Sequence, residues 1–441
     1  MAQKPDNIIF GVNEKPPLAA VLLLGLQHIF VMSSTLLLPV VIVREIGGSF
    51  LEIRNVVSFS LIAAGIGTIL QSLGKGIMGS GYLVPNICGP SYLSVSVQAA
   101  WLGGLPLMHG MIVVAGLFET LFSRVVHKLR VLFPTEVTGL VVLMVGVALI
   151  PLGASKFLGI QYEGDLVNAR VVVAASVTLF TMVGISLWSK GKSRLYCVLI
   201  GFVVGYIVSF MAGIISPVEF EKVLSAPLFA LPGLGTDSFR WSFSWSLLPP
   251  FLIVSLCGAL KSFGNLVTAQ KINDADWKEP DVRNIGNGLF ADGLSVMTAG
   301  ILGGVATDTS ASNVGTSLAT GATSRIIGFV AGSTYICLGF LPKLAALVSI
   351  MPDPVMGAIL IYVTSFMVLS GFQIILTEAV STNKIFIIGI SFIFGISLDI
   401  LPGLYMHIPS WLKPIFSSSL TFATITAILL NQLFRVRKQR E

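Results

Sequence analysis

The chain has 441 residues, of which 54% are hydrophobic and only 11% are charged, and its mean hydropathy is +0.89. Soluble globular domains carry about 25% charged residues, so this composition excludes a soluble protein and predicts many membrane-spanning segments. The net charge of +6 comes from basic residues scattered through short loops. That distribution argues against a nucleic-acid-binding face and indicates a membrane topology bias.

Apolar segments separated by polar residues, Gly or Pro divide the chain into fourteen predicted spans. An even number of spans places both termini on one side of the membrane. Most Lys and Arg residues fall in the loops on that side, which predicts that both termini are cytoplasmic. The predicted fold class is therefore an all-α, multi-pass protein embedded in the lipid bilayer of the cell (inner or plasma) membrane.

Two of the predicted spans are unsuited to forming a complete helix against lipid. Residues 81–100 contain Pro85, Gly89 and Pro90, and residues 306–320 are mostly Thr, Ser and Ala. Unpaired backbone groups are costly in hydrocarbon, so such segments lie inside protein or along a cavity. Each is the third span of a set of seven. Matched interruptions predict inverted repeats with a substrate site where the half-helices meet; two unrelated re-entrant loops are the alternative.

In the second interrupted segment, Ser312, Asn313 and Gly315 are predicted to lead from a short strand into a half-helix that begins near Gly315. The N–H groups at a helix start attract anionic or carbonyl groups of a ligand. The Asn313 amide offers both a donor and an acceptor, which suits the edge of a heterocycle. An ordinary capping role for Asn313 is equally compatible with the sequence.

Lys261 lies near the middle of residues 250–270, an otherwise uncharged run long enough to cross a bilayer. An ammonium at that depth costs at least about 2.5 kcal/mol, so it must face protein, water or a counter-charge. The position therefore predicts a functional site. A pair with Asp308 would lower the burial cost of both charges, and Asp292 is the other candidate partner. If Lys261 is permanently charged and paired, it would occupy the place of a coupling cation, and transport would be facilitated diffusion or exchange. If it is instead free to bind a ligand, it favours an anion.

Three short motifs connect the chain with a known family. Gln27-His28 lies in the first span, Ala291-Asp292-Gly293 lies in the ninth, and Asn313, Gly315, Thr320 and Gly321 follow the spacing Asn-x-Gly-x4-Thr-Gly in the tenth. With these motifs in this order, the chain resembles the nucleobase–ascorbate transporter family, also called nucleobase:cation symporter-2, which includes the xanthine/uracil permeases.

The resemblance implies two inverted seven-span repeats, with spans 3 and 10 each formed by a short strand plus a half-helix. It implies a core domain and a gate domain that move against each other like an elevator, and a homodimer formed through the gate. The segments would be the cytoplasmic N-terminus 1–17, the core parts 18–124 and 246–341, the gate parts 132–215 and 350–433, and the cytoplasmic tail 434–441.

The resemblance also implies a secondary transporter for a nucleobase or purine-like heterocycle, with no cofactor other than a coupling proton or sodium ion. Family members usually carry Glu and Asp four residues apart in the eighth span, where this chain has Lys261 and Asn265, and Gln or Glu where it has Ser312. Acceptors for N–H groups are thus replaced by donors. The alternative is a transporter or exchanger of a small organic or inorganic anion, with Lys261 as the binding charge.

The predicted site combines these observations. The substrate-binding residues are Lys261, Asn265, Ser312, Asn313, Gly315, Tyr92 and Asp308, and the coupling or supporting residues are Asp292, His28 and Gln27. For Tyr92, stacking on the substrate and ordinary packing are both open. For His28, a structural hydrogen bond to the third or eighth span is favoured over direct contact with the ligand.

Four other carboxyl groups in or near the predicted spans are interpreted as helix-end groups rather than proton relays: Glu119, Glu136, Glu378 and Asp399.

Other features argue against catalysis. The sequence contains no metal-ligand cluster, no nucleotide-binding loop and no nucleophile–base pattern. The sequence therefore predicts a transporter and not an enzyme.

Overall fold

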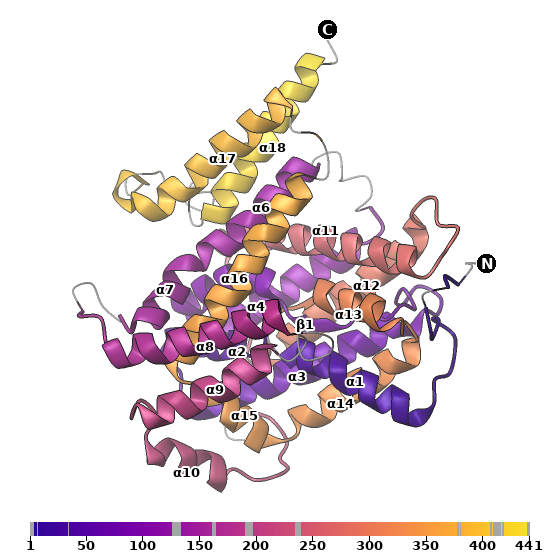
Figure 1. Cartoon of the computed structure of the whole chain (residues 1–441). Coiled ribbons are helices and arrows are strands. Elements are labelled where there is room, and N and C mark those ends of the chain that lie inside the picture. The colour runs from indigo at the N-terminus through magenta and orange to yellow at the C-terminus, as the bar shows by residue number, and fades with distance from the viewer. Residues whose placement is uncertain are drawn as a thin grey trace.

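The computed structural model describes residues 4–6, 8–33, 35–125, 134–160, 165–189, 197–233, 240–376, 379, 381–405, 408, 416 and 419–438. α-Helices fill most of this part of the chain (Figure 1). In its first half they are α1 (Leu18–Ser33), α2 (Leu37–Glu45), α3 (Phe50–Leu73), α4 (Leu93–Phe122), α6 (Thr135–Ala148), α7 (Ile150–Leu158), α8 (Ala169–Trp188), α9 (Cys197–Met211) and α10 (Pro217–Ser225). In its second half they are α11 (Leu248–Ile272), α12 (Val282–Leu302), α13 (Ala311–Thr320), α14 (Arg325–Gly339), α15 (Pro342–Ser349), α16 (Asp353–Ile375), α17 (Thr382–Ile400) and α18 (Ser419–Lys438). Short 3-10 helices are η1 (Pro90–Tyr92), η3 (Trp245–Leu247) and η4 (Pro402–Tyr405).

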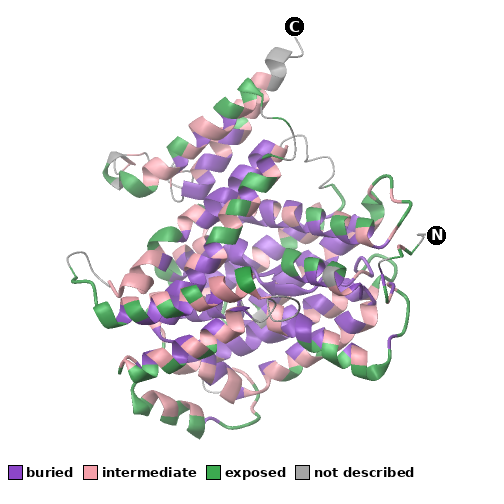
Figure 2. Cartoon of the chain, in the orientation of Figure 1, coloured by how far each residue is buried: buried purple, intermediate pink, exposed green. Residues whose placement is uncertain are grey.

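The helices pack in two groups. In the first, α3 packs along α14 and α4 along α12, and α11 contacts both α4 and α12. α1 packs on α14, α2 contacts α3 and α4, and α13 contacts α1 and α11, so these three helices belong to the same group. In the second, α16 packs against α6, α7, α8 and α9, while α17 pairs with α18, which also contacts α6. Figure 1 shows α17 and α18 at the top of the molecule, away from α1 and α14. Buried residues concentrate where the helices face one another, and exposed ones lie on the outer surface (Figure 2).

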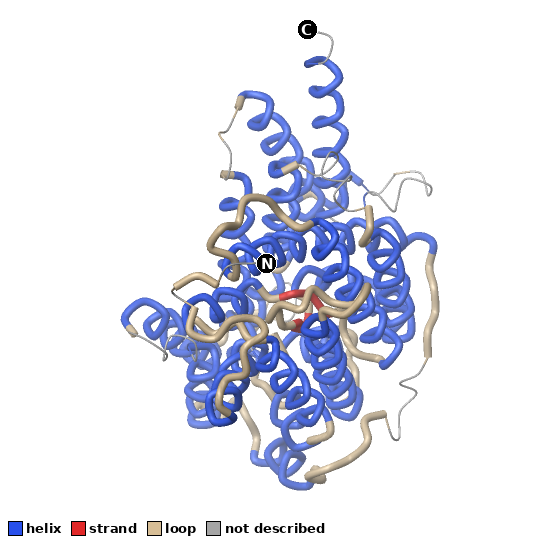
Figure 3. Tube along the Cα trace, turned by 90° about the vertical axis from the view of Figure 1, so that its right-hand side faces the viewer, coloured by secondary structure: helices blue, strands red, loops and turns tan. Residues whose placement is uncertain are grey.

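Two short strands lie inside the first group (Figure 3). β1 (Asn86–Cys88) and β2 (Thr307–Thr309) pair antiparallel, with Ile87 opposite Asp308. All residues of both strands are buried. Each strand thus finds its backbone partners in the other rather than in lipid, which satisfies the requirement that buried backbone groups be paired. The strand predicted in each interrupted segment is confirmed.

The count of spans differs from the sequence prediction. Within the described residues, nine helices are long and apolar enough to cross a membrane, and the bent pair α14 and α15 makes ten. α9 and part of α18 are shorter apolar helices. The segment from Pro90 to Phe122 covers two predicted spans, and its helix is interrupted at Gly103 and Gly104, where the backbone is not helical. The φ of 70° at Gly104 is left-handed, a conformation that favours glycine. These helices make the chain an integral, multi-pass membrane protein, while fourteen spans remain a prediction.

Small residues let the long helices approach closely. A Cβ atom added at Gly65 on α3 would lie 2.6 Å from the Gly332 carbonyl oxygen on α14. Glycines at such helix contacts allow the backbones to pack directly against each other in membranes. The contact between α3 and α14 also supports the first interrupted segment, because β1 packs against α3.

We expect Gly65→Ala to lower the free energy of unfolding by about 1–3 kcal/mol, because the new methyl group must push α3 and α14 apart. The matched control is Gly389→Ala on α17, where nothing lies within 4 Å of the added atom. There alanine should stabilise the helix by about 0.5–1 kcal/mol. Thermal unfolding of both purified variants gives the comparison, and equal Tm shifts would contradict the close contact.

Candidate binding site

A cavity of about 2320 Å³ lies between the two helix groups. On one side it is lined by α1, α11 and α13 of the first group, and on the other by α6 and α16 of the second. Lys261 and Asn265 stand one turn apart on α11, so both side chains reach the same wall. The walls are mainly apolar with a few polar groups from α11 and α13, as is typical of sites for small heterocyclic ligands.

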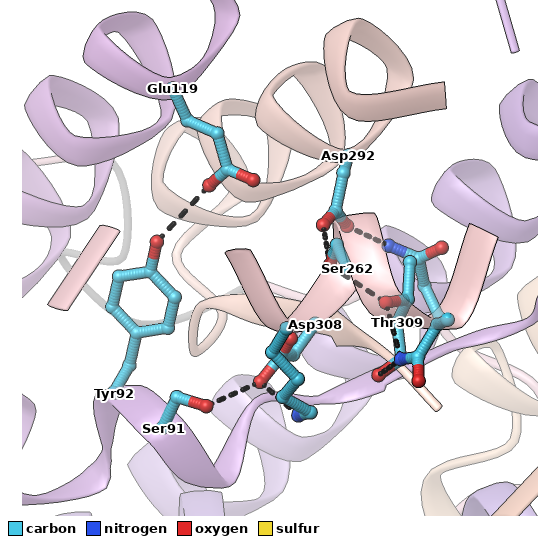
Figure 4. Close-up of polar contacts among 10 residues, drawn as sticks. Ser91, Tyr92, Glu119, Ser262, Asp292, Asp308 and Thr309 are labelled. Atoms are coloured by element: carbon cyan, nitrogen blue, oxygen red, sulfur yellow. Dashed lines mark hydrogen bonds and ion pairs between the residues drawn. The ribbon is translucent and has the colours of Figure 1, made fainter. Parts of the chain in front are cut away.

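Lys261 is paired with an acid. Its Nζ donates to Asp308 Oδ2 at 2.6 Å, and the Ser91 hydroxyl donates to the same oxygen at 2.7 Å (Figure 4). The Lys261 side chain is 23% exposed and lines the cavity, while the Asp308 side chain is 1% exposed. The predicted pair with Asp308 is confirmed, and Asp292 is not the partner. The ammonium therefore sits at the cavity wall with its counter-charge directly behind it.

A hydrogen-bonded network supports this wall from inside the protein. Ser262, next to Lys261 on α11, lies between Asp292 and Thr309 in Figure 4: its hydroxyl donates to Asp292 Oδ2, and its oxygen lies 2.7 Å from Thr309 Oγ1. The Asn86 amide on β1 donates to Asp292 Oδ1 at 2.7 Å. The Asn265 amide donates to Thr309 Oγ1 at 2.9 Å. The network ties both strands to α11 and α12, which fixes where Lys261 emerges.

The half-helix α13 begins earlier than predicted. It starts at Ala311 rather than near Gly315, because the Ser310 side chain caps it by accepting from the Asn313 N–H at 3.2 Å. Asn313 is therefore not the cap. Ser312 and Gly315 line the cavity on the first turns of α13. The helix start, with its positive dipole end, thus faces the cavity as the sequence predicted.

His28 and Asn313 form a buried pair between α1 and α13. His28 Nδ1 donates to Asn313 Oδ1 at 2.8 Å. His28 thus makes a hydrogen bond within the protein, but its partner lies in the tenth segment and not in the third or eighth, as was predicted. The adjacent Gln27 lines the cavity. The Asn313 side chain therefore holds α13 against α1 and is not itself part of the cavity wall.

Tyr92 lies behind the cavity rather than on it. Its side chain is buried, and its hydroxyl donates to Glu119 Oε2 at 3.2 Å (Figure 4). The Tyr92 ring packs against α11 at Gly258, where an added Cβ atom would lie 3.6 Å from it. This position favours packing over stacking on a substrate. Glu119 is 1% exposed and lies in the buried interior beside Tyr92. Glu119 also lies in the last turn of α4, so it is a helix-end group as interpreted, although its side chain faces the protein interior.

Two of the other carboxyl groups lie at helix ends as well. Glu136 lies in the first turn of α6, where Lys384 Nζ is 3.6 Å from Oε2, which agrees with a helix-end role. Asp399 lies in the last turn of α17. Glu378 lies outside the described residues.

Comparison with known proteins places the chain in a family. Residues 19–404 match the sequence model of xanthine/uracil permeases, described as the Permease family. The chain belongs to this family. It is 28% identical to the uric acid permease PucJ of Bacillus subtilis over 95% of this chain and 93% of that protein. It is 26% identical to the xanthine permease XanP of Escherichia coli over 98% of this chain and 96% of that protein. The predicted family is thus confirmed: the protein is a permease and not an enzyme.

Solved structures share the permease's fold. The transmembrane domain of the cyanobacterial bicarbonate transporter BicA superposes with a TM-score of 0.56 over 94% of this chain and 97% of that chain, at 13% identity. The structure of SLC26A9 gives a TM-score of 0.61 over 95% of this chain and 65% of that chain, at 11% identity. At these identities the likeness concerns the fold alone.

The permease's predicted site residues divide into two layers. Lys261, Asn265, Ser312, Gly315 and Gln27 line the cavity, while Asp308, Asn313, Tyr92, Asp292 and His28 lie behind it. Sequence reasoning missed Ser91, Ser262, Thr309 and Asn86, which connect these layers. Ser262 directly follows Lys261 in the sequence, and Thr309 directly follows Asp308. A polar residue next to a charged residue in a membrane-spanning segment is the signal that could have identified them.

Proposed function

We propose that the permease is a secondary transporter that moves a nucleobase, of the purine class, across the cell membrane. The observation that carries this proposal is the cavity between the two helix groups, walled by Lys261, Asn265 and the start of α13. Relatives named as uric acid and xanthine permeases, matched over nearly the whole chain, support a purine as the substrate.

The charge at the wall supports a neutral or weakly acidic oxopurine. Lys261 presents N–H donors to the cavity, but Asp308 balances its charge at 2.6 Å. A ring carbonyl can accept from such a donor without needing a net positive site. The paired acid removes the reason to prefer an inorganic anion, so the anion alternative is not favoured.

We further propose that the first helix group with its strands forms the core domain and the second forms the gate domain, in fourteen spans and two inverted repeats. Ion pairs join the groups away from the cavity: Arg44 on α2 contacts Asp353 on α16 at 3.2 Å, and Lys156 on α7 contacts Glu45 on α2 at 3.2 Å. An elevator-like movement of core against gate would break these pairs and re-form them in each cycle. A homodimer through the gate and cytoplasmic termini complete the proposal.

Uptake by proteoliposomes tests the proposed function. Labelled xanthine, urate and uracil are offered alone and with excess sulfate or bicarbonate as competitors. We expect saturable uptake of at least one oxopurine that the inorganic anions do not inhibit. If only inorganic anions enter the vesicles or compete, the nucleobase assignment is wrong.

A cavity-blocking variant makes the test specific to this site. Gly315 lines the cavity, and nothing lies within 4 Å of an added Cβ, so Gly315→Phe should introduce a ring that obstructs the cavity at the start of α13. We expect uptake to fall at least about tenfold, equivalent to about 1.4 kcal/mol. Gly389→Phe on α17 is the matched control, because its added Cβ is equally unobstructed but lies outside the cavity. Equal uptake by the two variants would place the substrate route elsewhere.

A further inference from the structure

We propose that the Lys261 ammonium acts as a tethered cation, in the place where a coupled transporter would load a sodium ion or a proton, so that this permease equilibrates or exchanges its substrate without an ion gradient. This inference rests on the proposed function and concerns the energetics of the same site.

The geometry around Asp308 provides the first argument. Its carboxylate is 1% exposed and lies on β2, where an unpaired charge would be strongly unfavourable. Lys261 Nζ and the Ser91 hydroxyl both donate to Oδ2, at 2.6 and 2.7 Å. A carboxylate and a hydroxyl buried together would be suitable ligands for a small hard cation. The lysine occupies that position with a charge that cannot diffuse away.

The origin of the paired groups provides the second argument. Lys261 lies on α11, Asp308 on β2 and Ser91 on η1, and these elements all contact one another or the same helices in the first group. If that group moves as the core, both charges move together. The pair adds no net charge to the moving body, so its passage neither requires an incoming cation nor responds to the membrane potential.

The other ionisable groups near the pair are held apart from the cavity. Asp292 on α12 receives hydrogen bonds on both oxygens, from Asn86 and from Ser262. Glu119 on α4 receives one from Tyr92. None of Asp292, Glu119 and Tyr92 is among the residues that line the cavity. Lys261 is the one charged residue among the described residues that line the cavity, and the acid next to it, Asp308, is already paired. A proton or sodium ion in the cavity therefore finds no unpaired carboxylate on the described wall.

The direct test is the ion dependence of xanthine transport in proteoliposomes, or of whichever oxopurine the uptake screen identifies. We expect uptake to change by less than about twofold, within about 0.4 kcal/mol, when sodium is replaced by choline, when a protonophore is added, or when a pH gradient is imposed. Unlabelled substrate inside the vesicles should accelerate entry of the labelled substrate. Uptake that collapses without sodium or a proton gradient would overturn the inference.

Variants of Lys261 test the mechanism. In Lys261→Ala, Asp308 and Ser91 are left to bind a mobile cation, so uptake in choline at neutral pH should fall at least about tenfold and be restored by sodium or by acid near pH 5.5. Lys261→Arg keeps a positive charge, so its uptake should remain independent of sodium and proton gradients. This variant keeps the proposal testable if Lys261→Ala fails to fold. Lys271→Ala, at the exposed end of the same helix, should behave as wild type. If Lys261→Ala is active and needs no added ion, the tethered-cation role is wrong.

The two proposals fail in different ways. If the wild-type protein moves no nucleobase even in exchange, the proposed function fails. If it moves a nucleobase but only with a sodium or proton gradient, the proposed function stands and the tethered cation does not.

Discussion

Lys261→Met is expected to lower the free energy of unfolding by about 3 kcal/mol, the lower end of the range for removing one partner of a buried ion pair. Methionine has a similar length but leaves the Asp308 carboxylate, whose side chain is 1% exposed, without its ammonium. The Ser91 hydroxyl alone then stabilises that carboxylate. Thermal unfolding of the purified protein in one detergent at fixed pH measures the loss.

Asp308→Asn is the matched control for this prediction. The Lys261 side chain is 23% exposed and lines the cavity, so water can solvate the ammonium when its partner is neutral. We expect a smaller loss of about 1–2 kcal/mol. The double variant Lys261→Met/Asp308→Asn should lose less than the two single losses combined, because both members of a coupled pair are then gone. Strictly additive losses would contradict the pair.

Much of the site could be predicted from the sequence because membrane burial makes polar residues conspicuous. Lys261 is the charge that hydrocarbon cannot tolerate unpaired, and Asp308 is an acid within the second interrupted segment. Backbone pairing rules likewise predicted that residues 81–100, with their prolines and glycines, lie inside the protein rather than against lipid. These inferences depend on the free-energy cost of placing a charge or an unpaired backbone group in the membrane, and the local sequence shows which residues would incur it.

The remainder depends on contacts between distant parts of the chain. The bond from Asn86 to Asp292 joins residues 206 positions apart, and that between His28 and Asn313 joins residues 285 apart. Packing also decides whether the α4 face that carries Glu119 points inward, because the local sequence near a helix end does not show whether an acid there is buried or exposed. The start of α13 was misplaced because several Ser and Asn residues there could serve as the cap, and only the fold selects Ser310.

Asp292 is a buried acid on α12 that connects strand β1 with helix α11. Its two oxygens take donors from different elements: Asn86 on β1 and Ser262 on α11. Asn86 belongs to the strand pair, and Ser262 is next to Lys261 in the sequence. Asp292 therefore fixes the position of β1 relative to α11, and with it the geometry of the cavity wall. A substitution here should act on stability before it acts on any ligand contact.

We expect Asp292→Ala to lower the free energy of unfolding by about 2–3 kcal/mol, because two buried donors lose their acceptor and a cavity remains. Asp292→Asn should lose at most about 1 kcal/mol: its carbonyl can accept from Asn86, and its amide can donate to the Ser262 oxygen, whose hydroxyl can then donate to Thr309. Thermal unfolding of both variants measures the difference. Equal losses would mean that the negative charge, and not the hydrogen bonding, stabilises the strands. An asparagine variant that is stable but has lost its oxopurine uptake would instead assign the Asp292 charge to transport, and would count against gradient-independent exchange.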